Sequence, residues 1–109
     1  MEILIAHLVG DYILQSDWMA ENKKKSNIAC LIHTIFYVLP FLLISYISLW
    51  QIIIMAIQHY YQDRYNFVVW FMKVKGSPNF AKSPMTPWSI ILTDNILHLC
   101  FIYFLVRLF

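Results

Sequence analysis

The sequence predicts an all-α polytopic membrane protein with four transmembrane helices in an antiparallel bundle. Hydrophobic residues make up 61% of the 109 residues and charged residues only 13%, a balance that is unusual for a soluble domain. No Asp, Glu, Lys or Arg occurs from Ser26 to Gln62. As one helix this run would reach roughly 55 Å, against a hydrocarbon core of about 30 Å. It must therefore fold back on itself, and we expect the reversal near Ser45 to Leu49.

Four apolar segments follow one another in a single domain that covers residues 1–109. The expected helices lie at about 2–21, 27–45, 50–73 and 87–109. The first ends in the polar run "AENKKKSN", which offers Ser26 or Asn27 as the cap of the second. Pro40 removes a backbone hydrogen bond and should kink the second helix. Thr86 and Pro87 fit the cap and the first position of the fourth.

The lysines indicate how the helices are oriented. They cluster in the first and third connections of the four-helix arrangement, at Lys23, Lys24, Lys25, Lys73, Lys75 and Lys82. Both basic connections then lie on one side, which the positive-inside tendency makes cytoplasmic, with both termini on the opposite side. We therefore interpret the net charge of +2 as a sign of how the helices are oriented in the membrane. No basic face interleaved with aromatic residues is present, so we expect no binding of nucleic acid.

Histidine and aspartate recur at four-residue spacing inside the predicted helices. Residues at i and i+4 share a helix face, so each pair can direct both side chains to one place. Counted from the cytoplasmic helix ends, all of them fall in one layer roughly 10 to 21 Å deep. The pairs are His7 with Asp11, His59 with Asp63 and Asp94 with His98, and the second helix adds His33.

This layer predicts a metal site. An ionisable group at the centre of a bilayer costs at least about 2.5 to 3.5 kcal/mol, so buried aspartates need a partner. Imidazoles and carboxylates from facing helices are common ligands of divalent ions, and this set suffices for one or two. Zinc is the first choice, with manganese or iron as alternatives. The predicted ligands are His7, Asp11, His33, His59, Asp63, Asp94 and His98, with Gln58, Gln62 and Asn95 as groups that orient them.

Two other interpretations of the same residues stay open. Asp–His hydrogen bonds can hold helices together without a metal, as in a non-catalytic interaction protein at a phage or host envelope. The same residue types also form proton or ion pathways, which in so small a chain would require a homo-oligomer. The roles of Asp17 and Arg64 are open as well, and we expect Arg64 to snorkel or to meet Asp17 or Glu21.

Several stretches of the chain resemble a known family. They are "AHLVGDYILQSDWMAENKKKS" at the start and, further on, "LIHTIFY", "IQHYYQDRY" and "TDNILHL". Together they resemble the domain of unknown function 3307 family, which comprises small integral membrane proteins of bacteria and phages. The resemblance implies a multi-pass helix bundle in the bacterial inner membrane and leaves its chemistry open. The His and Asp pattern is also similar to that of membrane-embedded metal-dependent hydrolases, including zinc amidases that act on lipids, although none of their diagnostic motifs is present.

These observations favour a membrane-embedded metal-dependent hydrolase. A divalent ion lowers the pKa of a bound water to about 7, and a nearby carboxylate can act as the base. The depth of the cluster points to a lipid-like ester, amide or phosphoester as the substrate. We expect Asp11 to be the general base and His33 to be a ligand or a proton shuttle. The bilayer and that substrate are the expected partners.

Overall fold

The protein consists of helices in the part of the chain that the structure describes. The computed structural model describes residues 1–65, 67–82 and 84–108, and no strand occurs among them. The α-helices are α1 (Glu2–Leu8), α2 (Asp17–Asn22), α3 (Asn27–Val38), α4 (Leu49–Arg64), α5 (Phe67–Val74) and α6 (Trp88–Leu108). A π-helix, η1 (Val9–Ile13), continues α1, and two 3-10 helices are η2 (Leu39–Leu43) and η3 (Pro78–Ala81). The all-α prediction is confirmed.

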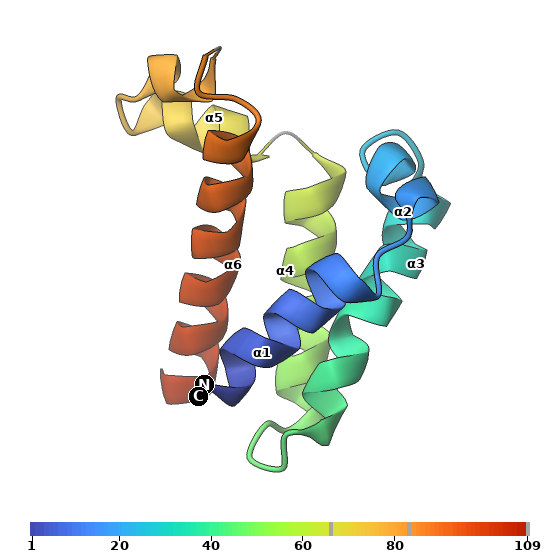
Figure 1. The fold of residues 1–109 in the computed structure, drawn as a ribbon. Helices are drawn as coiled ribbons and strands as arrows, with labels where there is room; N and C mark the ends of the chain where they lie inside the picture. The colour runs from blue at the N-terminus through green and yellow to red at the C-terminus, as the bar shows by residue number, and fades with distance from the viewer. Residues whose placement is uncertain (66, 83, 109) are drawn as a thin grey trace.

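Four helices build the body of the molecule. In Figure 1, α3, α4 and α6 run along its length, and α1 crosses them obliquely. α3 packs on α4, and α6 packs on both α4 and α1. α5 lies at the end where α6 begins, α2 lies at the same end, and both termini lie at the other end (Figure 1). The lysine-rich connections are therefore at the end opposite to the termini.

The first predicted helix, residues 2–21, is not continuous. α1 passes into the π-helix η1, and α2 starts afresh after Ser16, whose extended backbone breaks the helix and whose Oγ accepts a hydrogen bond from the Met19 amide. Gly10 lies in η1 against α3. A Cβ at this position would stand 2.5 Å from the carbonyl oxygen of Tyr37, so only glycine allows this approach.

The third predicted helix, residues 50–73, is divided into α4 and α5. Tyr65 is extended after the end of α4, and residue 66 lies outside the described residues. Lys24 Nζ donates to the carbonyl of Asp63 at 3.0 Å, and Arg64 Nη1 donates to the carbonyl of Lys24 at 2.5 Å. Arg64 Nε also bonds Asn27 Oδ1, rather than Asp17 or Glu21. The Lys24 and Arg64 side chains thus donate hydrogen bonds to backbone carbonyls. In a longer, unbroken helix such carbonyls would accept from the backbone amides of the helix itself.

The second and fourth helices are close to the prediction. Ser26 caps α3 through its Oγ, and the helix narrows to 3-10 geometry around Pro40. The chain then reverses between Leu43 and Leu49, as expected. α6 begins at Trp88, and the predicted end at residue 109 lies outside the described residues.

The prediction of four spans needs correction. Among the described residues only α6 is a helix long and apolar enough to cross a membrane, and the apolar stretch Asn27–Leu43 is shorter. The breaks described above shorten the other candidates, because the sequence pattern shows apolarity but not whether the backbone hydrogen bonds run without interruption.

The apolar core lies in the half of the molecule that is nearer to the termini. It is formed by Ala6, Tyr37, Phe41, Ile44, Ile47, Ile52, Met55, Ile102 and Leu105. The buried histidines and aspartates lie next to this core. Tyr37 lies at the boundary, because its ring belongs to the core while its hydroxyl reaches a histidine.

Candidate metal centre

Four segments that are distant in sequence bring histidine and aspartate side chains together inside the protein. η1 supplies Asp11, α3 supplies His33, α4 supplies His59 and Asp63, and α6 supplies Asp94 and His98. They form two groups that share Asp11. One contains Asp11, His33, His59 and Asp63, and the other contains Asp11, Asp94 and His98. Six of the seven predicted ligands thus lie together.

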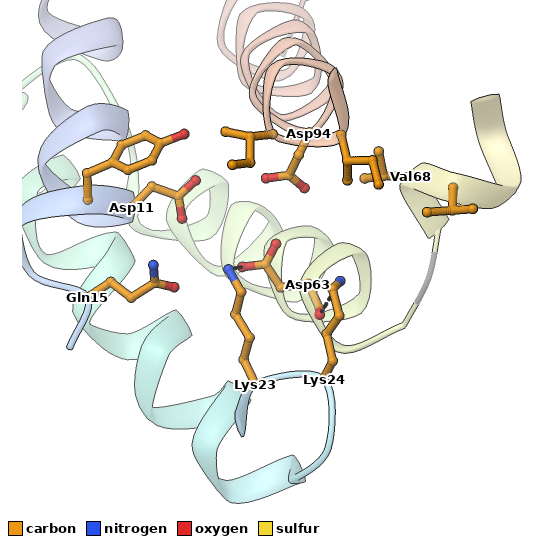
Figure 2. A pocket seen from close by; sticks show the side chains of 11 residues that line it. Asp11, Gln15, Lys23, Lys24, Asp63, Val68 and Asp94 are labelled. Carbon is orange, nitrogen blue, oxygen red and sulfur yellow. Dashed lines mark hydrogen bonds and ion pairs between the residues drawn. The ribbon is translucent and has the colours of Figure 1, made fainter. Parts of the chain in front are cut away.

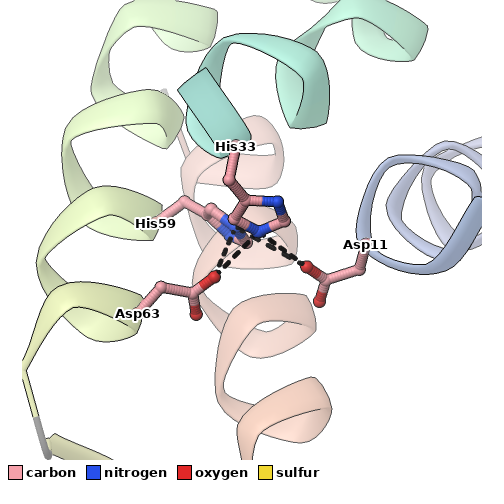
Figure 3. A group of neighbouring side chains, drawn as sticks. All are labelled: Asp11, His33, His59 and Asp63. Atoms are coloured by element: carbon pink, nitrogen blue, oxygen red, sulfur yellow. Dashed lines mark hydrogen bonds and ion pairs between the residues drawn. The ribbon is translucent and has the colours of Figure 1, made fainter. Parts of the chain in front are cut away.

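The spacing of the first group fits a metal ion. Its four candidate ligand atoms lie within 4.8 Å of one another, and ligands at about 2.0 to 2.2 Å from one ion are necessarily separated by no more than about 4.4 Å. His33 Nε2 and His59 Nε2 each lie 2.9 Å from Asp63 Oδ2. Asp11 Oδ1 lies 3.3 Å from His33 Nε2 and 3.6 Å from His59 Nε2. Figure 3 shows the four side chains converging from three segments.

Hydrogen bonding alone does not satisfy this group. The two Nε2 atoms of His33 and His59 are 3.0 Å apart and face the same oxygen of Asp63. If both carry hydrogen, both N–H groups must donate to that one oxygen. If only one does, its N–H can donate to the other ring, but the lone pair of the second nitrogen still lies 2.9 Å from the carboxylate oxygen. Asp11 Oδ1 is buried and has no hydrogen-bond partner among the described residues. A cation between these atoms would remove both conflicts.

The second group includes a histidine whose neutral tautomer is set by a chain of amides. Gln62 Nε2 donates to Asp94 Oδ1 at 2.8 Å, and Gln58 Nε2 donates to Gln62 Oε1 at 2.6 Å. Gln58 Oε1 therefore accepts from His98 Nδ1, at 3.3 Å. In neutral His98 the lone pair is then on Nε2, which lies 3.2 Å from Asp63 Oδ1 and 3.5 Å from Asp94 Oδ1. Such outer hydrogen bonds are typical of metal-binding histidines.

The seventh predicted ligand, His7, lies apart from both groups. Its Nε2 donates to Asn95 Oδ1 at 2.7 Å, and its Nδ1 accepts from the hydroxyl of Tyr37 at 2.6 Å. The closest Asp11 oxygen is 3.9 Å from Nε2. Both ring nitrogens are therefore engaged, and the role of His7 as a ligand stays a prediction. His7 is in α1 and Asp11 is in the π-helix η1. Because a π-helix has more residues per turn than an α-helix, the two side chains do not point in quite the same direction.

A cavity of about 240 Å³ adjoins the two groups. Asp11, Asp63 and Asp94 face it, together with Lys23 and Lys24 (Figure 2). Lys23 Nζ lies 3.2 Å from Asp63 Oδ2. Burial lowers the pKa of this lysine, but the nearby carboxylates of Asp63 and Asp11 raise it by more, so that the net shift is upward. Lys23 is therefore a fixed positive charge beside the candidate metal centre.

Two residues of this region, Tyr37 and Lys23, were not predicted to belong to it. The Tyr37 ring stacks on His59 with centroids 3.6 Å apart, and Lys23 was interpreted only as a topology signal. The signal for Tyr37 was present, because it follows His33 by four residues and shares its helix face. The suggestion that Gln58, Gln62 and Asn95 contact the histidines and aspartates agrees with their hydrogen bonds.

The fold and the site define a class: a helical protein with a buried His/Asp cluster that could hold a metal ion. The chain belongs to a particular family, described as "Protein of unknown function (DUF3307)", whose model matches residues 1–109. The family resemblance of the sequence motifs is thereby confirmed. Neither the curated proteins nor the solved structures give a significant match to the chain.

Proposed function

We propose that the protein is a membrane-embedded metal-dependent hydrolase that acts on a lipid-like ester, amide or phosphoester. Its centre binds one or two divalent ions, with zinc as the first choice and manganese or iron as alternatives. The ligands in this proposal are the six clustered residues: Asp11, His33, His59, Asp63, Asp94 and His98.

One observation carries the proposal: in neutral His98, Nε2 would direct a lone pair at carboxylate oxygens. The chain of amides from Asp94 to His98 keeps the ring proton on Nδ1. A bare lone pair 3.2 Å from an oxygen of Asp63 is unfavourable unless the ring is charged or a cation lies between the two atoms. The paired His33 and His59 pose the same conflict in the first group. Two such conflicts, one at each oxygen of Asp63, favour metal ions over hydrogen bonds that only hold the helices together.

The sharing of Asp11 by both groups supports a centre for two ions. One of its carboxylate oxygens could help to hold an ion of either group, while the other stays available as the base. Ions in such sites lie about 3.5 to 4 Å apart and clamp both the attacking and the leaving oxygen of a displacement. This arrangement favours hydrolysis over simple structural binding, for which one closed tetrahedral ion suffices.

The exterior of the protein supports a membrane location. Only 22% of the most apolar window of α6 is buried, whereas the core helix of a soluble protein would be mostly covered. Exposed large apolar side chains also occur along α3 and α4, among them Leu31, Ile35, Ile53 and Ile57. Apolar surface on this scale marks contact with a membrane or a partner. In the proposal, α6 crosses the bilayer and the other apolar faces contact lipid.

The proposed chemistry is hydrolysis by an activated water. A divalent ion supplies Lewis acidity and lowers the pKa of the water. The water oxygen forms a bond to the acyl or phosphoryl centre while Asp11, which faces both groups and the cavity, takes its proton. The bond to the leaving oxygen or nitrogen then breaks, and that atom departs with the proton that Asp11 returns. His33 does not line the cavity, so we assign it the role of ligand.

The proposal is tested by turnover on a panel of lipid esters, amides and phosphoesters in detergent. We expect hydrolysis that a chelator abolishes and that zinc, manganese or iron restores. Asp63→Asn should reduce turnover to background, because one oxygen can no longer act as an anionic ligand. Asp17→Asn is the matched control, since Asp17 is exposed and outside both groups. Asp63→Asn protein that is folded and still turns over would contradict the proposal.

A further inference from the structure

The cavity beside the metal centre has three kinds of lining. Three carboxylates surround it, two lysines reach it beside Asp63, and apolar side chains complete the lining (Figure 2). This apolar wall consists of Val68, Val69, Ile90 and Ile91. Ligand pockets usually measure about 300 to 1,000 Å³, so a cavity of about 240 Å³ suits the polar end of a molecule rather than the whole of a large ligand.

The net charge around the cavity changes sign when a metal ion binds. Three aspartates against two lysines leave one negative charge on the lining. A single divalent ion converts this to one positive charge, and a second ion adds two more. The attraction then favours an anion, and it is strong because the centre is buried.

Lys23 is placed to contact such an anion. Its Nζ lies 3.2 Å from Asp63 Oδ2, and its side chain is 17% exposed. The same oxygen lies 2.9 Å from two histidine nitrogens, so an ion bound there repels the ammonium group. Lysine has a flexible four-carbon stem and acts as a compact point charge for phosphate. The displaced group can therefore turn to an anion in the same cavity.

The apolar wall extends from the interior to the surface. Val68 is 4% exposed, whereas Ile91 is 49% exposed. Tyr12, 48% exposed, also lines the cavity. A ligand held by its polar end among the charged groups could thus continue along this wall onto the apolar exterior of the protein.

We propose that the cavity binds the phosphate group of an amphiphile, with Lys23 contacting the phosphate oxygens and the apolar wall contacting the adjoining chain. The inference rests on the proposed function and narrows its substrate class to phosphoesters carried on an apolar chain. Phosphate oxygens suit both a lysine and a centre of two ions. Neutral esters and amides would leave Lys23 without a charged partner.

Binding of dodecylphosphonate tests this inference, because this compound has no ester bond to cleave. Calorimetry on the full chain loaded with zinc, in a phosphate-free glycoside detergent, compares it with inorganic phosphate and with dodecanol. We expect dodecylphosphonate to bind at least about tenfold more tightly than inorganic phosphate, since each buried methylene adds to the affinity. Dodecanol should bind far more weakly than dodecylphosphonate.

Two sets of variants separate the contribution of the lysine charge from that of the apolar wall. Lys23→Gln should weaken the binding of both phosphate compounds by about tenfold or more, and Lys23→Arg should retain most of it. Lys25→Gln is the control, because Lys25 is exposed and does not line the cavity. Ile91→Ser should weaken only dodecylphosphonate. Ile96→Ser, equally exposed on the same helix but outside the cavity, should change neither.

The metal content of the same samples distinguishes the two levels of the proposal. Folded wild type that takes up no zinc overturns the proposed function together with the inference. Zinc-loaded wild type that binds dodecylphosphonate no better than dodecanol overturns the inference alone. Equal affinities for inorganic phosphate and dodecylphosphonate would make the cavity a site for free phosphate and would contradict the role of the apolar chain. Zinc-loaded Lys23→Gln with wild-type affinity would contradict the role of Lys23.

Discussion

The tautomer of neutral His98 depends on Asp94, which contacts the ring directly and also through a chain of two amides. Asp94 lies 3.5 Å from His98 Nε2 and also anchors the amides of Gln62 and Gln58, which end at His98 Nδ1. Because a carboxylate only accepts, the direction of every hydrogen bond in the chain follows from it. The amides thus prepare the imidazole to offer Nε2 to a metal, as outer groups do in other metal sites.

Gln58→Leu tests this arrangement. The substitution removes the acceptor of the His98 Nδ1 proton, so the ring is no longer held in one tautomer. We expect the affinity for zinc to fall about 10- to 100-fold, measured by competition with a chelator of known affinity. Gln51→Leu is the control. Gln51 is buried in the same helix but bonds Leu105 and Ser48, so its loss should lower stability and leave zinc affinity unchanged. If Gln58→Leu binds zinc as tightly as Gln51→Leu, the role assigned to the amides is contradicted.

At the scale of residues, the sequence predicted most of the candidate site. Four-residue spacing placed His59 with Asp63 and Asp94 with His98, and both pairs meet in the structure. His7 Nε2 lies 3.9 Å from Asp11 Oδ2 across the π-helix, and its predicted role as a ligand stays a prediction. Lysines were treated as loop residues, since nothing in a linear pattern shows that a loop folds back onto a cluster.

The π-helix η1 is the element that positions Asp11. It lies against α3 at Gly10, where the approach is too close for any side chain. π-helical turns are rare and frequently occur at functional sites. Here the extra residue in the turn directs Asp11 into the cluster, where it belongs to both candidate groups.

Gly10→Ala should therefore disturb the site as well as the fold. The added methyl would meet the Tyr37 carbonyl, and overpacking of this kind costs about 1 to 3 kcal/mol. Because Asp11 is the next residue, we expect weaker zinc binding together with a lower midpoint of thermal unfolding. Gly76→Ala is the control. Gly76 has φ of 97° and nothing near its side-chain position, so alanine there should lower stability and spare zinc affinity. Intact zinc affinity in Gly10→Ala would contradict the role assigned to η1.

The sequence showed which segments are helical but not where they break. Pro40 indicated the change to 3-10 geometry in the second helix. No Gly or Pro stands at the break before Ser16 or at Tyr65. At Tyr65 the reason is tertiary, because Lys24 and Arg64 bind backbone carbonyls across the two connections. Interactions between segments distant in sequence are invisible to a pattern of apolar residues.

The whole molecule combines large exposed apolar side chains with buried polar groups that lie beside its apolar core. Buried histidines and aspartates lie inside, while large apolar side chains are exposed on the longest helix. Buried ionisable groups and many large exposed apolar side chains are both unusual in a soluble domain, and they are the basis for proposing a membrane location.

Cys100 offers a direct probe of that location. It is exposed near the middle of α6, whereas Cys30 is buried. In membranes from expressing cells, Cys100 should react with an apolar maleimide and resist a charged, membrane-impermeant one. Lys82→Cys, at an exposed position outside the helices, should react with both reagents in open membranes. Labelling of Cys100 by the charged reagent, at the rate seen for Lys82→Cys, would contradict a membrane-crossing α6.

The most direct test of the metal centre is the metal content of the purified protein, measured by elemental mass spectrometry. We predict one or two equivalents of zinc, manganese or iron in the wild type, and none in a folded double variant with His59→Ala and Asp63→Ala. His7→Ala should keep its metal, because both nitrogens of His7 are bonded to Tyr37 and Asn95. A folded wild type that stays free of metal even after incubation with these ions would contradict the account, as would a double variant that retains its metal.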